Sequence, residues 1–296
     1  MTPFADPVLH ALTAAGLDPG EVERVVLGAL QEDLALGPDV TTEATVPAGA
    51  TATADVVARA AGTIAGVPVA LAVLGAGAAS QLRVEMLRTD GERVSPGDTV
   101  LRITGPLRSL LTRERAMLNL LTHLSGVATL TRAWVEQVAR TGAVIRDTRK
   151  TLPGLRVLEK YAVRCGGGAN HRMALGDAAL VKDNHVTAAG GIAAAVRAVR
   201  IHAPDVDLEV ECDSLDQVRE AVIAGVTLVL LDNMNTAQLC AAVAVARSAP
   251  GVRLEASGGF TLARAREVAE TGVDYLAVGA LTHSAPVLDL GLDVRD

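Results

Sequence analysis

Residues 226–259 read VTLVLLDNMNTAQLCAAVAVARSAPGVRLEASGG, and this stretch decides the fold. Two short apolar runs, Leu228–Asp232 and Val252–Glu255, flank the segment 236–248, which has the pattern of a helix. A strand, a helix and a second strand in this order are typical of two parallel strands joined by a right-handed crossover. The stretch therefore predicts an α/β unit with a parallel sheet.

The same alternation continues on both sides of this stretch. A long amphipathic helix is predicted over Arg113–Arg140, and six strands follow it at intervals of roughly 20–30 residues. The other four strands are predicted at Val144–Asp147, Ala179–Lys182, Leu208–Glu211 and Tyr275–Val278, with further helices over 190–202, 214–224 and 261–272. Repeats without an obvious reversal point favour a closed barrel over an open doubly wound sheet.

The front of the chain has a different pattern. Two short helices are predicted within residues 5–34, separated by the turn signal Asp18-Pro19-Gly20. Strands are predicted over Thr51–Val57 and Gly62–Val67, an apolar helix around 68–80, and a hairpin-like pair over Leu82–Thr89 and Thr99–Thr104. This order predicts an α+β unit with mostly antiparallel strands.

Composition excludes several functional classes. The net charge is −7 and only 2% of the residues are aromatic, so the chain offers neither a broad basic face nor a stacking platform for nucleic acid. Three widely spaced cysteines, Cys165, Cys212 and Cys240, exclude a disulfide framework and argue against a zinc site. The apolar run Val67–Ser80 is too short to span a bilayer, and the N-terminus lacks signal-peptide features. We therefore expect a cytoplasmic protein that binds neither nucleic acid nor membrane.

Lysine is confined to one part of the sequence. The chain has 27 basic residues, of which only Lys150, Lys160 and Lys182 are lysines. The window 146–185 holds eight Lys and Arg against four acids, 8 − 4 = +4, in a chain whose total is −7. A lysine presents a compact ammonium where arginine presents a planar fork, so the two are not interchangeable at an anion site. The window predicts a site for an anionic small molecule.

Five of the six predicted strands end in charged residues. In parallel barrels the functional groups lie at the carboxyl ends of the strands, so we expect these side chains to meet in one pocket. Solvated loops also place polar residues at strand ends, but five such ends favour a shared site. The cationic side of the pocket is Arg149, Lys150, His171, Arg172 and Lys182, and the anionic side is Glu211 and Asp232.

Two glycine-bearing turns follow the last two predicted strands. Ser257-Gly258-Gly259 runs into the helix predicted from residue 261, and Gly279 follows the final strand. Backbone N–H groups at such a helix start are a natural phosphate cradle. Two separated carboxylates suit Mg²⁺ or ribose hydroxyls, since Mg²⁺ prefers a few carboxylates together with substrate phosphates. The pocket therefore predicts a phosphorylated, metal-bound sugar and a second anion.

Several motifs resemble the quinolinate phosphoribosyltransferase family. They are Arg113–Asn119, His123–Thr129, Arg146–Arg156 (RDTRKTLPGLR), Glu159–Val163, Gly166–Arg172 (GGGANHR), Val181–His185, Glu209–Cys212, Leu231–Met234 and Glu255–Gly259. The resemblance covers nearly the whole chain, from Glu32 to Gly279. It departs from the family pattern at Pro38, where a proline interrupts a common Gly-Asp-Val-Thr run.

The resemblance implies a fold and a reaction. The fold is α/β, an incomplete TIM-like barrel at 119–283 preceded by an α+β open sandwich domain at 1–118, with the tail 284–296 packing on the sandwich. The reaction joins quinolinate and 5-phosphoribosyl-1-pyrophosphate, with Mg²⁺, to give nicotinate mononucleotide, pyrophosphate and CO₂ in NAD biosynthesis. A homodimer or higher homo-oligomer with shared active sites is also implied.

The resemblance also implies residue roles. The pyridine dicarboxylate binders correspond to Thr148, Arg149, His171, Arg172 and Lys182, with Arg115 supplied by a neighbouring subunit. The sugar side corresponds to Lys150, Glu211 and Asp232, and the two acids would meet the metal mainly through substrate and water. The 5-phosphate group corresponds to Ser257, Gly258, Gly259, Gly279 and His283. Catalytic roles fall to Lys150, Lys182, Glu211 and Asp232.

Three other functions compete with this interpretation. A phosphoribosyltransferase acting on nicotinate would have no second carboxylate to bind, which the cationic pocket disfavours. A barrel aldolase would form a Schiff base on Lys150 or Lys182, and borohydride trapping with a carbonyl substrate would reveal it. A protein that only binds an anion would have lost a site residue, and none is missing from the motifs.

Overall fold

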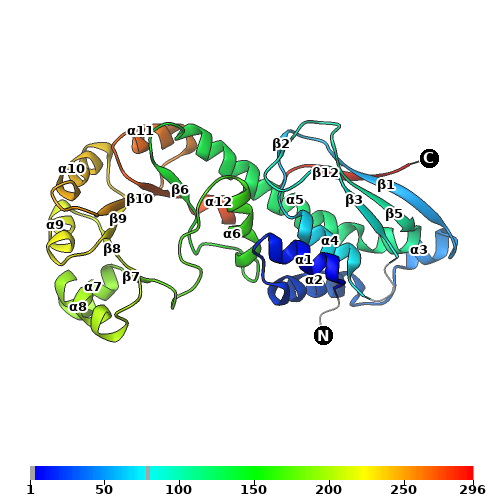
Figure 1. Ribbon diagram of the computed structural model, residues 1–296, viewed down its shortest axis with the longest axis horizontal. Coiled ribbons are helices and arrows are strands. Elements are labelled where there is room, and N and C mark those ends of the chain that lie inside the picture. Colours follow the sequence, from blue (N-terminus) through cyan, green and yellow to red (C-terminus); the bar gives the residue numbers. More distant parts are fainter. Residues whose placement is uncertain (1–3, 78–80, 296) are drawn as a thin grey trace. The chain divides into compact units, whose positions relative to one another are not determined.

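The computed structural model describes residues 4–77 and 81–295 (Figure 1). The chain forms two compact units. Unit 1 comprises Met1–Arg132, Thr151–Gly167 and Thr282–Asp296, and unit 2 comprises Ala133–Lys150 and Gly168–Leu281. The division after residue 118 that the family resemblance implied lies inside helix α5 (Leu107–Gln137), and residues of this helix belong to both units.

Unit 1 is built on an antiparallel sheet with strand order β12-β1-β5-β3. Its strands are β1 (Thr51–Ala58), β3 (Arg83–Met86), β5 (Thr99–Pro106) and β12 (Leu290–Val294), and a small second sheet pairs β2 (Gly62–Thr63) with β4 (Arg93–Val94). Its helices are α1 (Asp6–Ala14), α2 (Pro19–Leu34), α3 (Val40–Thr45), α4 (Val67–Gly75) and α6 (Arg156–Cys165). The predicted mixture of helices and antiparallel strands is confirmed.

Two local predictions in unit 1 need adjustment. The two N-terminal helices form as expected, because the Asp18 side chain caps α2 by accepting the Glu21 N–H at 2.9 Å. The strand expected over Gly62–Val67 is only two residues long. It stops early because Gly66 has φ +100° and starts α4, whose first N–H groups are bound by the Asp90 carboxylate.

Unit 2 is an α/β unit with one parallel sheet, in the order β6-β11-β10-β9-β8-β7. The strands are β6 (Val144–Arg146), β7 (Ala179–Val181), β8 (Leu208–Cys212), β9 (Leu228–Asp232), β10 (Arg253–Ser257) and β11 (Tyr275–Ala277). The helices after them are α7 (Asp183–Ala189), α8 (Ile192–His202), α9 (Leu215–Ile223), α10 (Thr236–Ala246) and α11 (Ala265–Ala269). Figure 1 shows the strands along the inside of an arc, with α9, α10 and α11 on its outer side.

The sheet of unit 2 is not closed. Strands β6 and β7 are its two edges, so the preference for a closed barrel from spacing alone is wrong, and the incomplete barrel implied by the resemblance is confirmed. The chain between the two edges is mostly irregular, and Ala169 makes a single parallel bridge to Arg146. This segment adds one extended contact to β6 without forming a strand.

The last predicted helix is also shorter than expected. Residues 258–261 form a turn, after which a 3₁₀ turn (Leu262–Arg264) leads into α11, only five residues long. Within residues 4–77 and 81–295, no helix combines the length and apolar character that crossing a membrane requires.

Candidate active site

The strands of unit 2 are parallel, so their carboxyl ends lie along the same side of the sheet, and several of the predicted charged residues lie there. Val181 is in register with Val210, so Lys182 lies beside the end of β8, where its Nζ is 2.5 Å from Glu211 Oε2. Ser257 is in register with Asp232 on the neighbouring strand. The edge therefore carries a lysine, two carboxylates and a serine from four successive strands.

The charges of two guanidinium groups, Arg149 and Arg172, act on each other in this unit. Burial lowers the pKa of Arg172, and the charge of Arg149 lowers it further, while Asp177 and Glu209 act in the opposite sense. Arg149 Nε is buried and has no hydrogen-bond partner. Like charges that are only partly compensated favour a bound anion, and two planar forks suit a ligand with two carboxylates.

The loop after Arg172 is held by its own hydrogen bonds. The Asp177 carboxylate accepts the N–H of Met173 at 2.6 Å and of Ala174 at 3.0 Å. Arg172 Nη1 donates to the Ala178 carbonyl at 2.9 Å. The Arg172 guanidinium is therefore tethered at one nitrogen, which limits the directions in which its other donors can point.

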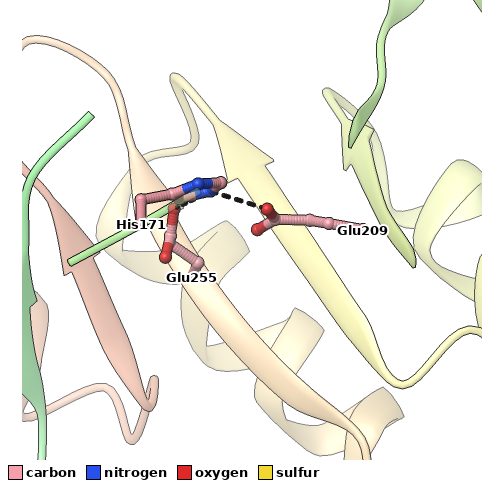
Figure 2. Close-up of side chains that lie close together, drawn as sticks. All are labelled: His171, Glu209 and Glu255. Atoms are coloured by element: carbon pink, nitrogen blue, oxygen red, sulfur yellow. Dashed lines mark hydrogen bonds and ion pairs between the residues drawn. The ribbon is translucent and has the colours of Figure 1, made fainter. Parts of the chain in front are cut away.

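The sheet of unit 2 carries a buried charge cluster. It comprises Arg146 on β6, Glu209 on β8, Glu255 on β10 and His171 from the chain between β6 and β7. His171 Nε2 is 2.7 Å from Glu209 Oε2 and 3.4 Å from Glu255 Oε1 (Figure 2). Arg146 Nη1 is 2.6 Å from Glu255 Oε2. Burial raises the pKa of Glu255 to about 7, and the charge of Glu209 adds to this, while Arg146 and His171 oppose it.

The cluster is an internal network of this chain. Ligand atoms of His171, Glu209 and Glu255 lie within 4.8 Å of one another, a grouping that a metal ion could use. Arg146 already neutralises Glu255, and the His171 ring already bonds to Glu209. These pairings compensate the buried charges only in part, because Glu209 Oε1 and Glu255 Oε1 are buried and have no hydrogen-bond partner.

The two acids expected on the sugar side are half-buried at neighbouring strand ends. One oxygen of Glu211 meets Lys182, and Asp232 Oδ2 accepts from Asn233 Nδ2 at 2.7 Å. Hard oxygen donors that are partly accessible to water suit Mg²⁺, which keeps several waters when bound. The donor set therefore fits a magnesium ion shared with a phosphorylated substrate.

The glycine turn after β10 packs against the end of β9. Gly258 has φ +113°, and a Cβ placed on it would lie 2.5 Å from Asn233 Oδ1. The Asn233 N–H donates to the Ser257 carbonyl at 2.9 Å. The helix expected from residue 261 starts later, with a 3₁₀ turn at Leu262–Arg264 and α11 at Ala265, and the phosphate cradle stays a prediction. Any phosphate here would meet the N–H groups of the turn itself.

The remaining predicted site residues are distributed over both units. In unit 2, Thr148 Oγ1 accepts the Lys150 N–H at 3.0 Å, Lys150 is exposed, and Gly279 is half-buried after β11. In unit 1, Arg115 is exposed on α5, and His283 Nδ1 lies 2.6 Å from Ser284 Oγ.

No individual role was predicted for Glu209, Glu255 or Asp147, although Asp147 and Glu255 end two of the predicted strands. All three are buried, and the Asp147 carboxylate accepts the His171 N–H at 2.9 Å and contacts Asn170 Nδ2 at 2.5 Å. The sequence signal that could have identified Glu209 and Glu255 is a glutamate within an otherwise apolar predicted strand. Glu209 precedes Glu211 by two residues, so both side chains point to the same face of β8.

Comparison with known proteins matches both parts of the chain to one family. Residues 39–125 match the model of the quinolinate phosphoribosyl transferase N-terminal domain, and residues 127–293 match that of its C-terminal domain. A Mycobacterium leprae protein named nicotinate-nucleotide pyrophosphorylase [carboxylating] is 54% identical over 270 residues, which cover 90% of this chain and 94% of that protein.

Solved structures agree with the sequence comparison. NadC from Streptococcus pyogenes has a TM-score of 0.87 and 38% identity, covering 95% of this chain and 99% of that one. A nicotinate-nucleotide pyrophosphorylase from Francisella tularensis has a TM-score of 0.86 and 35% identity, covering 93% and 96%. The motifs, the incomplete barrel and these matches lead to one conclusion: the chain belongs to the quinolinate phosphoribosyl transferase family.

Proposed function

We propose that this protein transfers the phosphoribosyl group of 5-phosphoribosyl-1-pyrophosphate to quinolinate, with decarboxylation. The products are nicotinate mononucleotide, pyrophosphate and CO₂, and the reaction belongs to NAD biosynthesis. The observation that carries the proposal is the match of both family domains, together with 54% identity to a carboxylating nicotinate-nucleotide pyrophosphorylase over 90% of the chain.

Recognition of the diacid is assigned to the cationic side of the pocket. The proposed binders are Thr148, Arg149, His171, Arg172 and Lys182. The effect of the Arg149 charge on Arg172 supports this, because two carboxylates would relieve the repulsion between the two guanidiniums. Lys182 is paired with Glu211 at 2.5 Å, so a carboxylate of the substrate would share or replace that partner. Nicotinate offers one carboxylate and would use this set less fully.

Binding of the phosphoribosyl donor is assigned to the opposite side. Lys150 would contact the pyrophosphate-bearing sugar, and Glu211 with Asp232 would hold the ribose side and a magnesium ion through substrate and water. A bound Mg²⁺ would withdraw charge from the leaving pyrophosphate. The 5-phosphate is assigned to the turns at Ser257, Gly258, Gly259 and Gly279, with His283.

The chemistry follows from the charges of these groups. The lone pair of the pyridine nitrogen attacks the anomeric carbon as pyrophosphate leaves, and positive charge develops on the sugar. Glu211 and Asp232 would stabilise that charge, and Lys150 the leaving group. No general base is needed, because the attacking nitrogen carries no proton. The C2–carboxylate bond then breaks, the pyridinium accepts its electrons, and a proton replaces CO₂ at that carbon.

A shared active site in a homodimer is part of the proposal. Arg115 matches the residue that family members supply from the neighbouring subunit, and it is exposed on α5. Sedimentation would test the oligomer directly. Arg115→Ala mixed with Lys182→Ala would test the sharing, because mixed dimers would regain one intact site if the two residues come from different subunits.

The test of the proposed function compares two acceptors. The purified protein, phosphoribosyl pyrophosphate and Mg²⁺ are incubated with quinolinate or with nicotinate, and mononucleotide is measured. We expect product from quinolinate and little from nicotinate. Product from nicotinate alone would overturn the assignment of Arg149, Arg172 and Lys182 to a diacid.

A further inference from the structure

Two of the motifs that carry the family resemblance have no residue in the proposed site. They are His123–Thr129 on α5 and Glu159–Val163 on α6. The first residue of each motif meets the other, because His123 Nε2 lies 2.9 Å from Glu159 Oε1. The side chain of Glu159 is fully buried. A buried carboxylate that the proposed chemistry does not use therefore joins these two helices.

The second oxygen of Glu159 holds the main chain in front of α6. Glu159 Oε2 accepts the Leu152 N–H at 3.0 Å. A carboxylate is costly to bury unless its oxygens have partners, and here each oxygen has one. Leu152 is itself 39% exposed, so this hydrogen bond fixes a surface segment to a group inside the protein.

The other side-chain contacts of this segment are weaker. Arg24 Nη2 donates to the Gly154 carbonyl at 2.9 Å, and Arg156 Nε donates to Thr151 Oγ1 at 3.1 Å. The Arg24 side chain is 55% exposed, and a hydrogen bond in contact with water contributes little. The bond to Glu159 forms away from water and should dominate the placement of the segment.

Lys150 lies between two fixed points of the main chain. The Asp147 N–H donates to the Ala169 carbonyl at 3.2 Å where the chain leaves β6, and the Leu152 N–H donates to Glu159. Only four residues, 148–151, separate these two points. The Lys150 side chain is exposed, so the place that its ammonium can reach depends on how the main chain is held.

We infer that Glu159 is a positioning residue, which holds the Leu152 N–H and thereby fixes Lys150 against the leaving pyrophosphate. The inference rests on the proposed function, in which Lys150 contacts the pyrophosphate-bearing sugar. Glu159 acts only through the main chain that joins it to Lys150. Because a displacement of about 1 Å in a reacting or stabilising group can lower a rate about 100-fold, a bond remote from the chemistry has a large effect.

The first test replaces the acceptor of the Leu152 N–H. Glu159→Leu removes it, whereas Glu159→Gln keeps an oxygen that can accept this N–H. We expect Glu159→Leu to lower kcat/KM for phosphoribosyl pyrophosphate about tenfold or more, and Glu159→Gln to lower it less than about threefold. Equal losses in the two variants would contradict a role for the hydrogen bond.

A double-mutant cycle tests whether Glu159 acts through Lys150. In a Lys150→Ala background, Glu159→Leu should lower kcat/KM further by less than about threefold, because the group that it positions is gone. Single-turnover product formation at high enzyme concentration extends the measurement to slow variants. A loss of the same size in both backgrounds would overturn the inference.

The matched control lies on the same helix. The Tyr161 hydroxyl donates to Asp90, whose carboxylate accepts the N–H groups of Gly66 and Val67, each at 3.0 Å. Tyr161→Phe should lower the melting temperature and leave kcat/KM for phosphoribosyl pyrophosphate within about twofold of the wild type. A loss equal to that of Glu159→Leu would show that any weakening of α6 has this effect, and the inference would fail.

A second measurement uses the wild-type protein without substrates, so it needs neither a variant that folds nor activity. We expect the Leu152 amide to exchange its hydrogen at least about 100-fold more slowly than in an unstructured peptide. Exchange at the rate of an unstructured peptide would overturn the inference whatever the protein catalyses. Inactivity of a wild-type protein with a protected Leu152 amide would instead overturn the proposed function.

Discussion

Among single side chains, we expect the substitution of Lys182 to have the largest effect on activity. It pairs with Glu211 at the edge of unit 2, and its side chain is 46% exposed, so the pair adds little to stability. We expect Lys182→Ala to lower kcat/KM for quinolinate by about tenfold or more, since an ion pair to a carboxylate is lost. The melting temperature should change by less than about 2 °C.

The control for this substitution is a surface ion pair on α9. Arg219 meets Asp216 with side chains 54% and 94% exposed, so Arg219→Ala removes a similar contact away from the strand ends. The measurement is kcat/KM for quinolinate in both variants, from steady-state kinetics. Equal kcat/KM values for Lys182→Ala and the wild type would remove Lys182 from the site.

Glu255 makes stability depend on pH. Its pKa is raised from 4.5 to about 7, so between these values the folded protein holds a proton that the unfolded chain has released. The stability that this proton contributes is complete below pH 4.5 and is lost as the pH rises through 7, by up to about 3 kcal/mol. Glu255→Gln cannot release a proton and lacks this dependence.

Urea unfolding at pH 5 and pH 8 measures the effect. At each pH, the free energy of unfolding of the wild type is subtracted from that of Glu255→Gln. This difference should increase by up to about 3 kcal/mol from pH 5 to pH 8, because only the wild type loses stability. A difference that stays constant between the two pH values would mean that Glu255 titrates alike in the folded and unfolded states.

Among the turns and strands, the turn after β10 has the least tolerance for change. Alanine at position 258 would need φ near +113°, and its Cβ would lie 2.9 Å from the backbone nitrogen of Asn233. We expect Gly258→Ala to displace the end of β9 and raise the KM for phosphoribosyl pyrophosphate about tenfold or more, with strain of about 1–3 kcal/mol. Steady-state kinetics at saturating quinolinate measure it.

Gly28 provides the matched glycine. It lies within α2, and no atom would lie within 4 Å of a Cβ placed there. Gly28→Ala should leave both KM values unchanged and stabilise the helix slightly, because alanine has the better helix propensity. Should Gly258→Ala behave like Gly28→Ala in every assay, the turn would have no part in binding the donor.

The strand ends were predictable because apolar runs of β propensity stop at charged residues. Lys182, Glu211 and Asp232 could therefore be placed at one edge of the sheet from sequence. The buried charge cluster could not be assembled in this way, because Arg146, His171 and Glu255 meet only through the strand order, with β6 and β8 separated by three other strands. Sequence gives the ends of strands, whereas contacts across the sheet depend on tertiary order.

At the scale of the whole molecule, the units are not consecutive segments. The segment Thr151–Gly167 belongs with unit 1 although it directly follows Lys150, and β12 pairs with β1 near the chain's end. Patterns along a sequence favour one cut between contiguous domains, so the return of α6 to unit 1 had no signal in periodicity. The family motifs lie in both units, because they mark residues with proposed functional roles and do not depend on where a domain ends.

The C-terminal strand should contribute to the stability of unit 1. Leu290 is buried and pairs with Ala58, whereas Val294 is 48% exposed at the other end of β12. We expect Leu290→Ala to cost about 2–5 kcal/mol, and Val294→Ala less than about 1 kcal/mol. Calorimetry of the two variants compares them within one strand. Equal melting temperatures would mean that β12 adds no buried packing.

The most direct test of the central claim follows the fate of the 2-carboxylate. Wild-type protein is given quinolinate labelled at that carboxyl carbon, with phosphoribosyl pyrophosphate and Mg²⁺, and labelled CO₂, pyrophosphate and mononucleotide are quantified together. We predict equal amounts of all three. Mononucleotide without labelled CO₂, or no mononucleotide from quinolinate at all, would contradict it.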